Sequence, residues 1–413
     1  FGKDYVSIDS SSTVHLKDID VHPYIKYTVH PSKVYELKIH TEQLDAQELV
    51  NSFPQGMFES LEGMQVSGKL QYDLNLNLDE KRPDDVIFNS RLKGHGFKVV
   101  RWGKTNLQKI NQAFVYTPYE YEKPMRNIII GPENPDYTPI NEISPYLKNA
   151  LLTAEDPSFY SHNGFVEESI RKSIATNFKE KAFKRGGSTI YMQLVKNVYL
   201  NRQKTLARKI EEILIVWILE NGNLATKQRM FETYLNIIEW GRNVYGIGEA
   251  ARYYFAKHPS ELDLGESIFL ASIVPRPKSG LYRFEGDGSL RSSLHGYFRL
   301  IGGLMARRGM TSLDSNAAYG FYSVRLKESL RSGIPVVDSL TADSVLTGEE
   351  TEDESSILQQ IFGKKRADTV HVKDVNKQKI IADTAMTKPQ TRRERREQRK
   401  QERIEKNKND TNQ

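Results

Sequence analysis

Two adjacent carboxylates stand out in residues 154–165, a stretch that combines groups able to exchange protons with a helix breaker. Glu155 and Asp156 are followed at once by Pro157, and His162 comes shortly afterwards. Proline cannot continue a helix comfortably, because it lacks the backbone N–H and clashes with the preceding turn. A carboxylate presented where a packed helix gives way to a loop suits general acid–base catalysis. The ordinary alternative is two solvated acids at a helix end.

The residues before Glu155 predict the helix that would present it. Ser144 is a favourable N-cap, and Pro145 suits the first helical position. Apolar side chains recur along the segment that follows: Tyr146, Leu147, Ala150 and Leu151. We therefore expect a helix from residue 145 to about residue 155.

A second cluster lies in residues 185–197, where two glycines precede another predicted helix. Ser188 is the expected N-cap, which leaves free backbone N–H groups that favour an anion such as phosphate. Gln193, Lys196 and Asn197 are spaced at i, i+3 and i+4, so they should share one helix face. The spacing of a Walker loop is absent. An ordinary capped helix is the alternative.

A third cluster, in residues 204–221, predicts a helix that is polar at its start and apolar in its second half. Lys204, Arg208 and Lys209 supply positive charge, and Glu212 lies at the edge of the apolar half. A carboxylate in that position needs a partner. An ion pair on the helix surface is the alternative.

Composition excludes several kinds of site. The 413-residue chain has no cysteine, which excludes disulfides, a catalytic thiol and cysteine-ligated zinc. Its nine histidines show no H-E-x-x-H spacing, so we expect no structural metal. The net charge of +6 suits a phosphate-bearing or anionic-membrane partner as well as nucleic acid. The longest apolar run, residues 213–219, is too short to span a bilayer, so we expect any membrane anchor upstream of this chain.

The pattern predicts an α+β chain in four parts. We expect a β-rich region at 1–115, a linker at 116–143, a mostly helical region at 144–335 and a disordered charged tail at 336–413. Alternation of apolar and polar residues predicts a half-buried strand at 69–78, with further candidates at 24–29, 34–39 and 96–102. Residues 53–70 resemble the β-modules of AsmA-like envelope proteins. A generic antiparallel sheet is the alternative.

Two more motifs, at residues 231–255 and 270–279, follow the first three in order. Together the five motifs resemble the family 51 glycosyltransferases over residues 144–310. These are the peptidoglycan glycosyltransferases of monofunctional transglycosylases and of bifunctional penicillin-binding proteins. The resemblance implies a lysozyme-like, mostly helical domain. It also implies that this domain polymerises lipid II into glycan strands, with inversion and release of undecaprenyl pyrophosphate.

The same resemblance implies a role for each matching residue. Glu155 would be the catalytic general base, and Glu212 would be a second catalytic glutamate near the pyrophosphate. Substrate-binding roles fall to Asp156, His162, Ser188, Gln193, Lys196, Asn197, Lys204 and Arg208. Tyr191 and Met192 replace polar residues of the family pattern, so of three adjacent positions only Gln193 matches. No cofactor is required, and a Mg²⁺ or Mn²⁺ ion at the pyrophosphate is left open.

The implied partners are lipid II, the nascent glycan chain and a membrane surface, with no nucleic acid. The implied location is the periplasmic face of the bacterial inner membrane. No S-x-x-K and K-T-G motifs follow, so we expect a monofunctional enzyme with a separate transpeptidase. Residues 178–185 interleave phenylalanine with lysine and arginine, and the family implies a mobile, lipid-facing jaw there. A solvated basic loop is the alternative, and residues 232 and 236 look architectural.

Two other functions compete with this interpretation. A glycan-cleaving enzyme with a lysozyme-like fold would use a glutamate as acid at the scissile bond. A non-catalytic envelope scaffold or lipid-transfer protein would use the β-rich region as its working part. The cationic residues near Glu212 argue against cleavage, and the intact Glu155 argues against a non-catalytic role.

Overall fold

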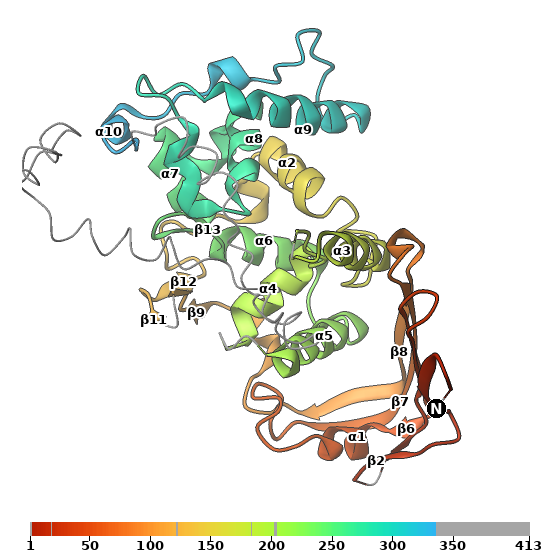
Figure 1. The fold of residues 1–413 in the computed structure, drawn as a ribbon. Helices are drawn as coiled ribbons and strands as arrows, with labels where there is room; N and C mark the ends of the chain where they lie inside the picture. Colours follow the sequence, from red (N-terminus) through yellow and green to blue (C-terminus); the bar gives the residue numbers. More distant parts are fainter. Residues whose placement is uncertain (1, 18, 121–122, 183, 202–204, 336–413) are drawn as a thin grey trace, which may run out of the picture. The chain divides into compact units, whose positions relative to one another are not determined.

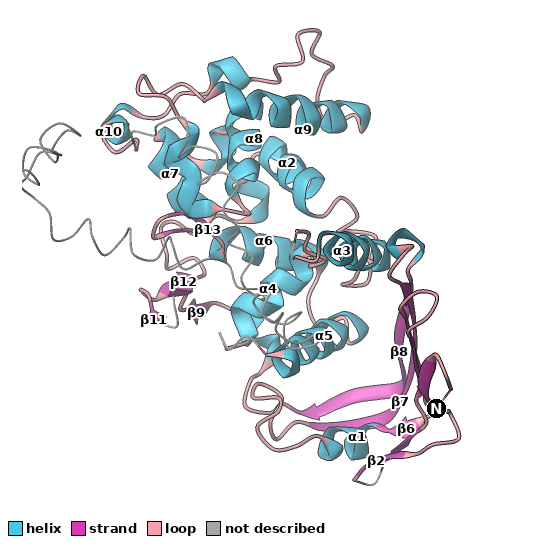
Figure 2. Ribbon diagram, viewed as in Figure 1, coloured by secondary structure: helices cyan, strands magenta, loops and turns pink. Residues whose placement is uncertain are grey.

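The computed structural model describes residues 2–17, 19–120, 123–182, 184–201 and 205–335 (Figure 1). Strands are concentrated before residue 131 and helices after residue 144, so the chain mixes sheet and helix (Figure 2). The tail predicted at 336–413 lies outside the described residues. Within the ranges given above, every helix is too short or too polar to cross a membrane.

One antiparallel sheet dominates the N-terminal region and is built around the strand predicted at 69–78. That strand, β7 (Gln65–Asp79), pairs on one side with β8 (Ile87–Arg101) and on the other with β5 (Val34–His40). The order is β1-β4-β5-β7-β6, where the other members are β1 (Tyr5–Ile8), β4 (Tyr24–Thr28) and β6 (Leu44–Asp45). Helix α1 (Ala46–Ser52) and the β2–β3 pair (Val14–Leu16 and Ile19–Val21) complete this region.

Strand β8 begins at Ile87, earlier than the predicted start at Gly96. In the first half of the strand three polar residues stand in succession, Asn89, Ser90 and Arg91, and they interrupt the apolar alternation. Near its far end the ladder with β7 shifts register, and Gly68 there has a φ of +92°. A Cβ on Gly68 would lie 2.5 Å from the backbone of Gly96, so the two strands approach each other too closely there for any residue but glycine.

The segment predicted as a linker, residues 116–143, carries short elements of its own. Strand β9 (Phe114–Tyr116) pairs with β12 (Ile128–Ile130), and β10 (Tyr119–Glu120) pairs with β11 (Lys123–Pro124). Ile128 and Ile130 are buried in the main core. A single 3-10 turn, Ile140–Glu142, then leads into the first long helix.

Helices make up most of the remaining described chain. They are α2 (Pro145–Glu155), α3 (Glu167–Glu180), α4 (Ile190–Tyr199), α5 (Leu206–Asn221), α6 (Lys227–Ile237), α7 (Ile247–Phe255), α8 (Leu264–Ile273), α9 (His295–Arg307) and the short α10 (Glu328–Arg331), with a β13–β14 hairpin (Glu239–Gly241 and Val244–Tyr245). Helix α8 is buried along almost its whole length, and α2 and α9 pack against it. The core between them is rich in large aromatic side chains, including Tyr234, Trp240, Tyr254 and Phe269.

The two residues that the sequence marks as architectural hold the chain before α2 against α6. Glu232 accepts a hydrogen bond of 2.8 Å from the backbone N–H of Ile140, and it pairs with Arg229. Asn236 exchanges two hydrogen bonds of 2.9 Å with the backbone of Thr138. Both side chains therefore fix the path of the chain into α2.

The N-terminal region is joined to the helices through a buried carboxylate on α5. Glu211 Oε1 accepts hydrogen bonds from the backbone N–H groups of Ser60, at 2.6 Å, and Leu61, at 3.2 Å. The Ser60 hydroxyl donates to the carbonyl of Tyr199 at the end of α4, also at 2.6 Å. One loop of the N-terminal region thus contacts both α4 and α5.

The segment predicted as a lipid-facing jaw contacts the sheet instead. Phe178, near the end of α3, packs edge-on against Tyr35 of β5 with ring centroids 5.9 Å apart. Lys179 pairs with Asp84 in the turn between β7 and β8. Phe183 lies outside the described residues. The expectation was wrong for Phe178, because this side chain packs on the N-terminal sheet and not on lipid, whereas for the rest of the segment it stays a prediction.

We expect Glu211→Ala to lower the free energy of unfolding by about 2 to 4 kcal/mol, since two backbone N–H groups lose their acceptor. Glu211→Gln keeps an oxygen at that point and should cost clearly less. Burial raises the pKa of Glu211 above its ordinary 4.5, so wild type should lose stability relative to Glu211→Gln as the pH rises from below that value. Urea unfolding at several pH values measures both effects, and equal losses in the two variants would contradict this account.

Candidate active site

Glu155 is the last residue of α2, as the sequence predicts, and its carboxylate is only partly exposed to solvent. Removal of water by the surrounding protein raises the pKa of Glu155, and the neighbouring charge of Asp156 adds a smaller increase. Helix α2 is rigidly packed through buried residues on its inner side. Glu155 is therefore held firmly, can be reached from outside, and binds a proton more readily than an ordinary surface glutamate does.

Asp156 is buried and acts as a junction between three segments. His162 Nε2 lies 3.0 and 3.1 Å from its two carboxylate oxygens, and the backbone N–H of Ile190 donates to Oδ2 at 3.1 Å. The structure thus brings Asp156 and His162 together, as sequence proximity suggests. Their contacts hold the end of α2 and the following loop against the start of α4.

The start of α4 differs from the predicted start by one residue. Thr189, not Ser188, is the N-cap, and its hydroxyl accepts a hydrogen bond of 3.2 Å from Met192 N. One of the N–H groups expected to be free, that of Ile190, already binds Asp156. An internal carboxylate therefore occupies part of the helix terminus that was assigned to an external anion.

Gln193 on α4 links Glu155 to the core. Its Nε2 donates to Glu155 Oε2 at 3.4 Å, and the hydroxyl of Tyr234 donates to its Oε1 at 3.0 Å. Tyr234 is fully buried on α6, so the hydroxyl has one fixed direction. Gln193 was predicted to bind substrate, and the structure adds that it orients Glu155.

Two tyrosines near Glu155 were missed from the sequence. Burial raises the pKa of both Tyr234 and Tyr297, and the negative charge of Glu155 adds a smaller increase to each. Tyr234 lies within the motif at 231–255, where its aromatic ring reads as core packing. Tyr297 is in α9, far along the chain, and no local spacing connects it with Glu155.

A compact charged cluster lies at the start of α5. Glu212 is 1% exposed, and Lys209 Nζ lies 2.7 Å from its Oε1 while Arg208 lies 3.6 Å from its Oε2. Lys209 also donates to the Ser188 hydroxyl at 3.1 Å. Arg208 and Glu212 were predicted for the site, whereas Lys209 was noted only as a neighbour of Glu212. Its i, i+3 spacing from Glu212 was the available signal.

Two buried polar atoms in this cluster have no hydrogen-bond partner within the described part of the chain: Arg208 Nε and Glu212 Oε2. Buried polar groups are nearly always hydrogen-bonded, so such atoms indicate a place where a ligand or water completes the set. The cluster holds two cations for one carboxylate, which leaves net positive charge for an anion. It can therefore stabilise negative charge that develops on a leaving group.

The described residues contain no group of three His, Asp or Glu side chains placed to share a metal ion. Glu212 is the only carboxylate of its cluster, and both of its oxygens face cations. This donor set does not fit a resident divalent ion, because Mg²⁺ needs near-octahedral oxygen ligation. Arg208 and Lys209 are therefore the groups of this cluster that could bind an anion directly.

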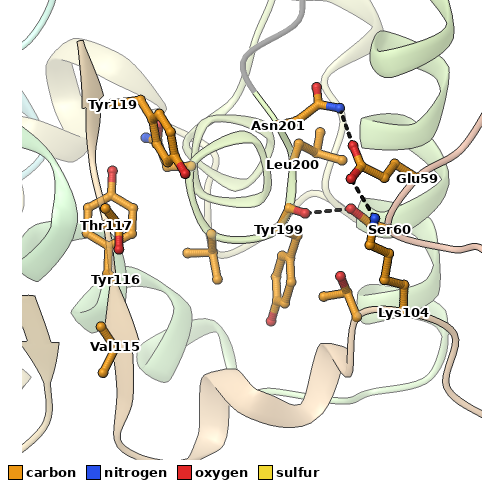
Figure 3. Close-up of a pocket in the computed structure, with 13 residues that line it drawn as sticks. Glu59, Ser60, Lys104, Val115, Tyr116, Thr117, Tyr119, Tyr199, Leu200 and Asn201 are labelled. Carbon is orange, nitrogen blue, oxygen red and sulfur yellow. Dashed lines mark hydrogen bonds and ion pairs between the residues drawn. The ribbon is translucent and has the colours of Figure 1, made fainter. Parts of the chain in front are cut away.

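Of the remaining predicted residues, Asn197 lines a separate cavity, Lys196 lies on α4, and Lys204 lies outside the described residues. Asn197 lines a polar cavity of about 230 Å³ together with the loop at Glu59 and Ser60 (Figure 3). Figure 3 shows Tyr116 and Tyr119 on the side of this cavity opposite Glu59 and Lys104. Lys196 is half-buried on α4.

Tyr191 and Met192, which depart from the family pattern, are both buried in the core of the helical region. Tyr191 lies against Lys227, whose ammonium is 5.0 Å from the ring centroid. Among the described hydrogen bonds, Gln193 is joined to Glu155 and neither Tyr191 nor Met192 is. Of the three adjacent positions, only Gln193 therefore contributes to the site.

In a comparison with known proteins, residues 122–287 match the model of the transglycosylase family. A biosynthetic peptidoglycan transglycosylase of Methylobacillus flagellatus is 38% identical over 167 residues, which cover 39% of this chain and 72% of the relative. Those of Dechloromonas aromatica and Paraburkholderia xenovorans are 44% and 42% identical over 142 residues, covering 34% of this chain and 61% and 58% of the relatives. The residues matched by the family model include Glu155 and Glu212.

We expect Gln193→Leu to lower kcat roughly tenfold, because Glu155 loses the group that orients it. The Gln193 hydrogen bond lowers the pKa of Glu155, so its loss should move the acidic limb of the kcat/KM profile to higher pH. Gln228→Ala, at an exposed position of α6, is the control and should leave the profile unchanged. If kcat fell but the acidic limb stayed at the same pH, Gln193 would not influence the pKa of Glu155, which would contradict this account.

Proposed function

The chain belongs to the transglycosylase family of peptidoglycan glycosyltransferases, and we propose that it polymerises lipid II into glycan strands. The single observation that supports this most strongly is the combination of a half-buried Glu155, whose pKa is raised, with the cationic cluster at Arg208 and Lys209. Helix α4 and the residues just before it contact both groups, through Gln193 and Ser188. A base and an anion site on one rigid support are what the reaction requires.

In the proposed reaction, the 4-hydroxyl of the acceptor N-acetylglucosamine attacks the anomeric carbon of the growing chain. A new carbon–oxygen bond forms there while the bond to the pyrophosphate oxygen breaks, so the configuration inverts. Glu155 Oε takes the hydroxyl proton, and both electrons of the broken bond leave with undecaprenyl pyrophosphate. A raised pKa helps the base, since proton transfer is most effective when the base is not too weak at the working pH.

Arg208 and Lys209 would stabilise the negative charge that grows on the departing pyrophosphate. Glu212 would hold these two cations in place, and Lys196 and Lys204 would add charge from α4 and from the loop before α5. Asp156 and His162 would hold the end of α2, and with it Glu155, in a fixed position next to the start of α4. A divalent ion at this point would have to take most of its ligands from the pyrophosphate, because Glu212 is the one carboxylate that the described residues bring to this cluster.

We also propose a lysozyme-like fold for residues 144–335 and a site of action at the periplasmic face of the bacterial inner membrane. Lipid II and the nascent chain would both be bound at a membrane surface. The absence of S-x-x-K and K-T-G motifs from the sequence favours a separate transpeptidase as partner. These assignments follow from the family and from the chemistry of the substrate.

Labelled lipid II tests the proposal directly. Wild type should give polymer, whereas Glu155→Gln should lower the rate by about 10² to 10⁴, the usual contribution of a general base. Glu142→Gln removes an exposed carboxylate and is the control. Degradation of isolated sacculi without polymer would favour glycan cleavage, and absence of both products would favour a non-catalytic envelope role.

Lys209→Met should lower kcat/KM by roughly 10²-fold, because one cation of the leaving-group site is lost. Lys209→Arg should restore part of the rate, and Lys123→Met, at an exposed position, should have no effect. Thermal unfolding of each variant checks that the fold is retained. An unchanged rate in folded Lys209→Met would remove Lys209 from the proposed mechanism.

A further inference from the structure

Helix α5 carries an apolar stripe that leads away from the charged cluster. Ile213 and Trp217 follow Lys209 at i+4 and i+8, so the three side chains lie along one side of the helix. Ile213 is 41% exposed although it is a large aliphatic residue, and Trp217 is half-buried. An exposed aliphatic side chain beside a cation suits a ligand with an anionic head and an apolar chain.

The stripe ends at an apolar cavity of about 450 Å³ between α5 and the N-terminal region. Its lining includes Leu49 and Val50 of α1, Leu92 of β8, and Leu214 and Trp217 of α5. The indole N–H of Trp217 donates to the carbonyl of Leu92 at 2.8 Å, and its ring packs edge-on against Phe97, which also lines the cavity. The wall is therefore apolar where α5 forms it.

The cavity, at about 450 Å³, is large enough to hold a ligand. Ligand pockets are typically about 300 to 1,000 Å³ and mostly apolar. The lining comes from both the sheet region and α5, which Glu211 and Trp217 hold together by hydrogen bonds. The cavity is thus a built feature of this junction.

The distance along α5 matches a lipid-linked anion. From Lys209 to Trp217 the helix rises about 12 Å. A pyrophosphate held at Lys209 and Arg208 would place the first units of its attached chain over Ile213, and the following units at the cavity. We propose that this cavity binds the isoprenoid chain of the polyprenyl pyrophosphate donor, an inference that rests on the proposed function.

The test compares lipid II carrying its full-length polyprenyl chain with an analogue whose chain has only three isoprene units. Val50→Trp and Leu214→Trp fill the cavity from α1 and from α5, and both should raise KM for the long-chain substrate at least fivefold. Neither should change KM for the short-chain analogue, which is too short to fill the cavity. Val100→Trp, at a position on β8 that is 66% exposed, is the matched control.

The outcomes separate the inference from the proposed function. If wild type polymerises neither substrate, the proposed function fails. If wild type polymerises both, and the filled variants remain folded with unchanged KM values or with equal changes for both chain lengths, the cavity does not bind the isoprenoid. A phospholipid with brominated acyl chains quenches the fluorescence of Trp217 if it enters the cavity. If undecaprenyl pyrophosphate does not relieve this quenching, the cavity binds phospholipid and the proposal is overturned.

Discussion

The buried carboxylate of Asp156 determines where the catalytic elements meet. It accepts hydrogen bonds from a histidine ring and from the first backbone N–H of α4, so three segments converge on one residue. A buried charge that loses a partner costs about 3 to 5 kcal/mol, which makes this arrangement strongly preferred over looser ones. Glu155 is the next residue back along the chain, and its position follows from that of Asp156.

Helix α4 and the residues just before it lie between two different electrostatic environments. Around Glu155, burial and the charge of Asp156 disfavour ionisation, so the carboxylate becomes a better base. Around Glu212, two cations outnumber one carboxylate, so the surroundings favour an added anion. The proposed reaction needs a proton acceptor at one point and charge stabilisation at another. The fold provides each with its own set of side chains.

The sequence predicted most local features and few long-range contacts. The helix ending at Glu155 and the strand at 69–78 were predictable because capping residues and period-2 alternation act over short distances. The pairing of Glu211 with the backbone of Ser60 was not, because nothing local marks which of two adjacent glutamates faces the sheet region. Tyr234 was missed for a related reason, because it reads as an ordinary helix residue until the opposing element is known. Lys209 was noted only as a neighbour of Glu212, and its contact with Ser188 was not predicted.

The contacts of α3 and α5 with the sheet also bear on whether the catalytic region can be exchanged between proteins. Phe178 and Trp217 turn aromatic side chains toward Tyr35 and Phe97 of the N-terminal region. If the helical region were transplanted alone, these aromatic surfaces would be exposed to water and would promote aggregation. A chimera would therefore need polar replacements at positions 178 and 217 to keep the exposed surface soluble.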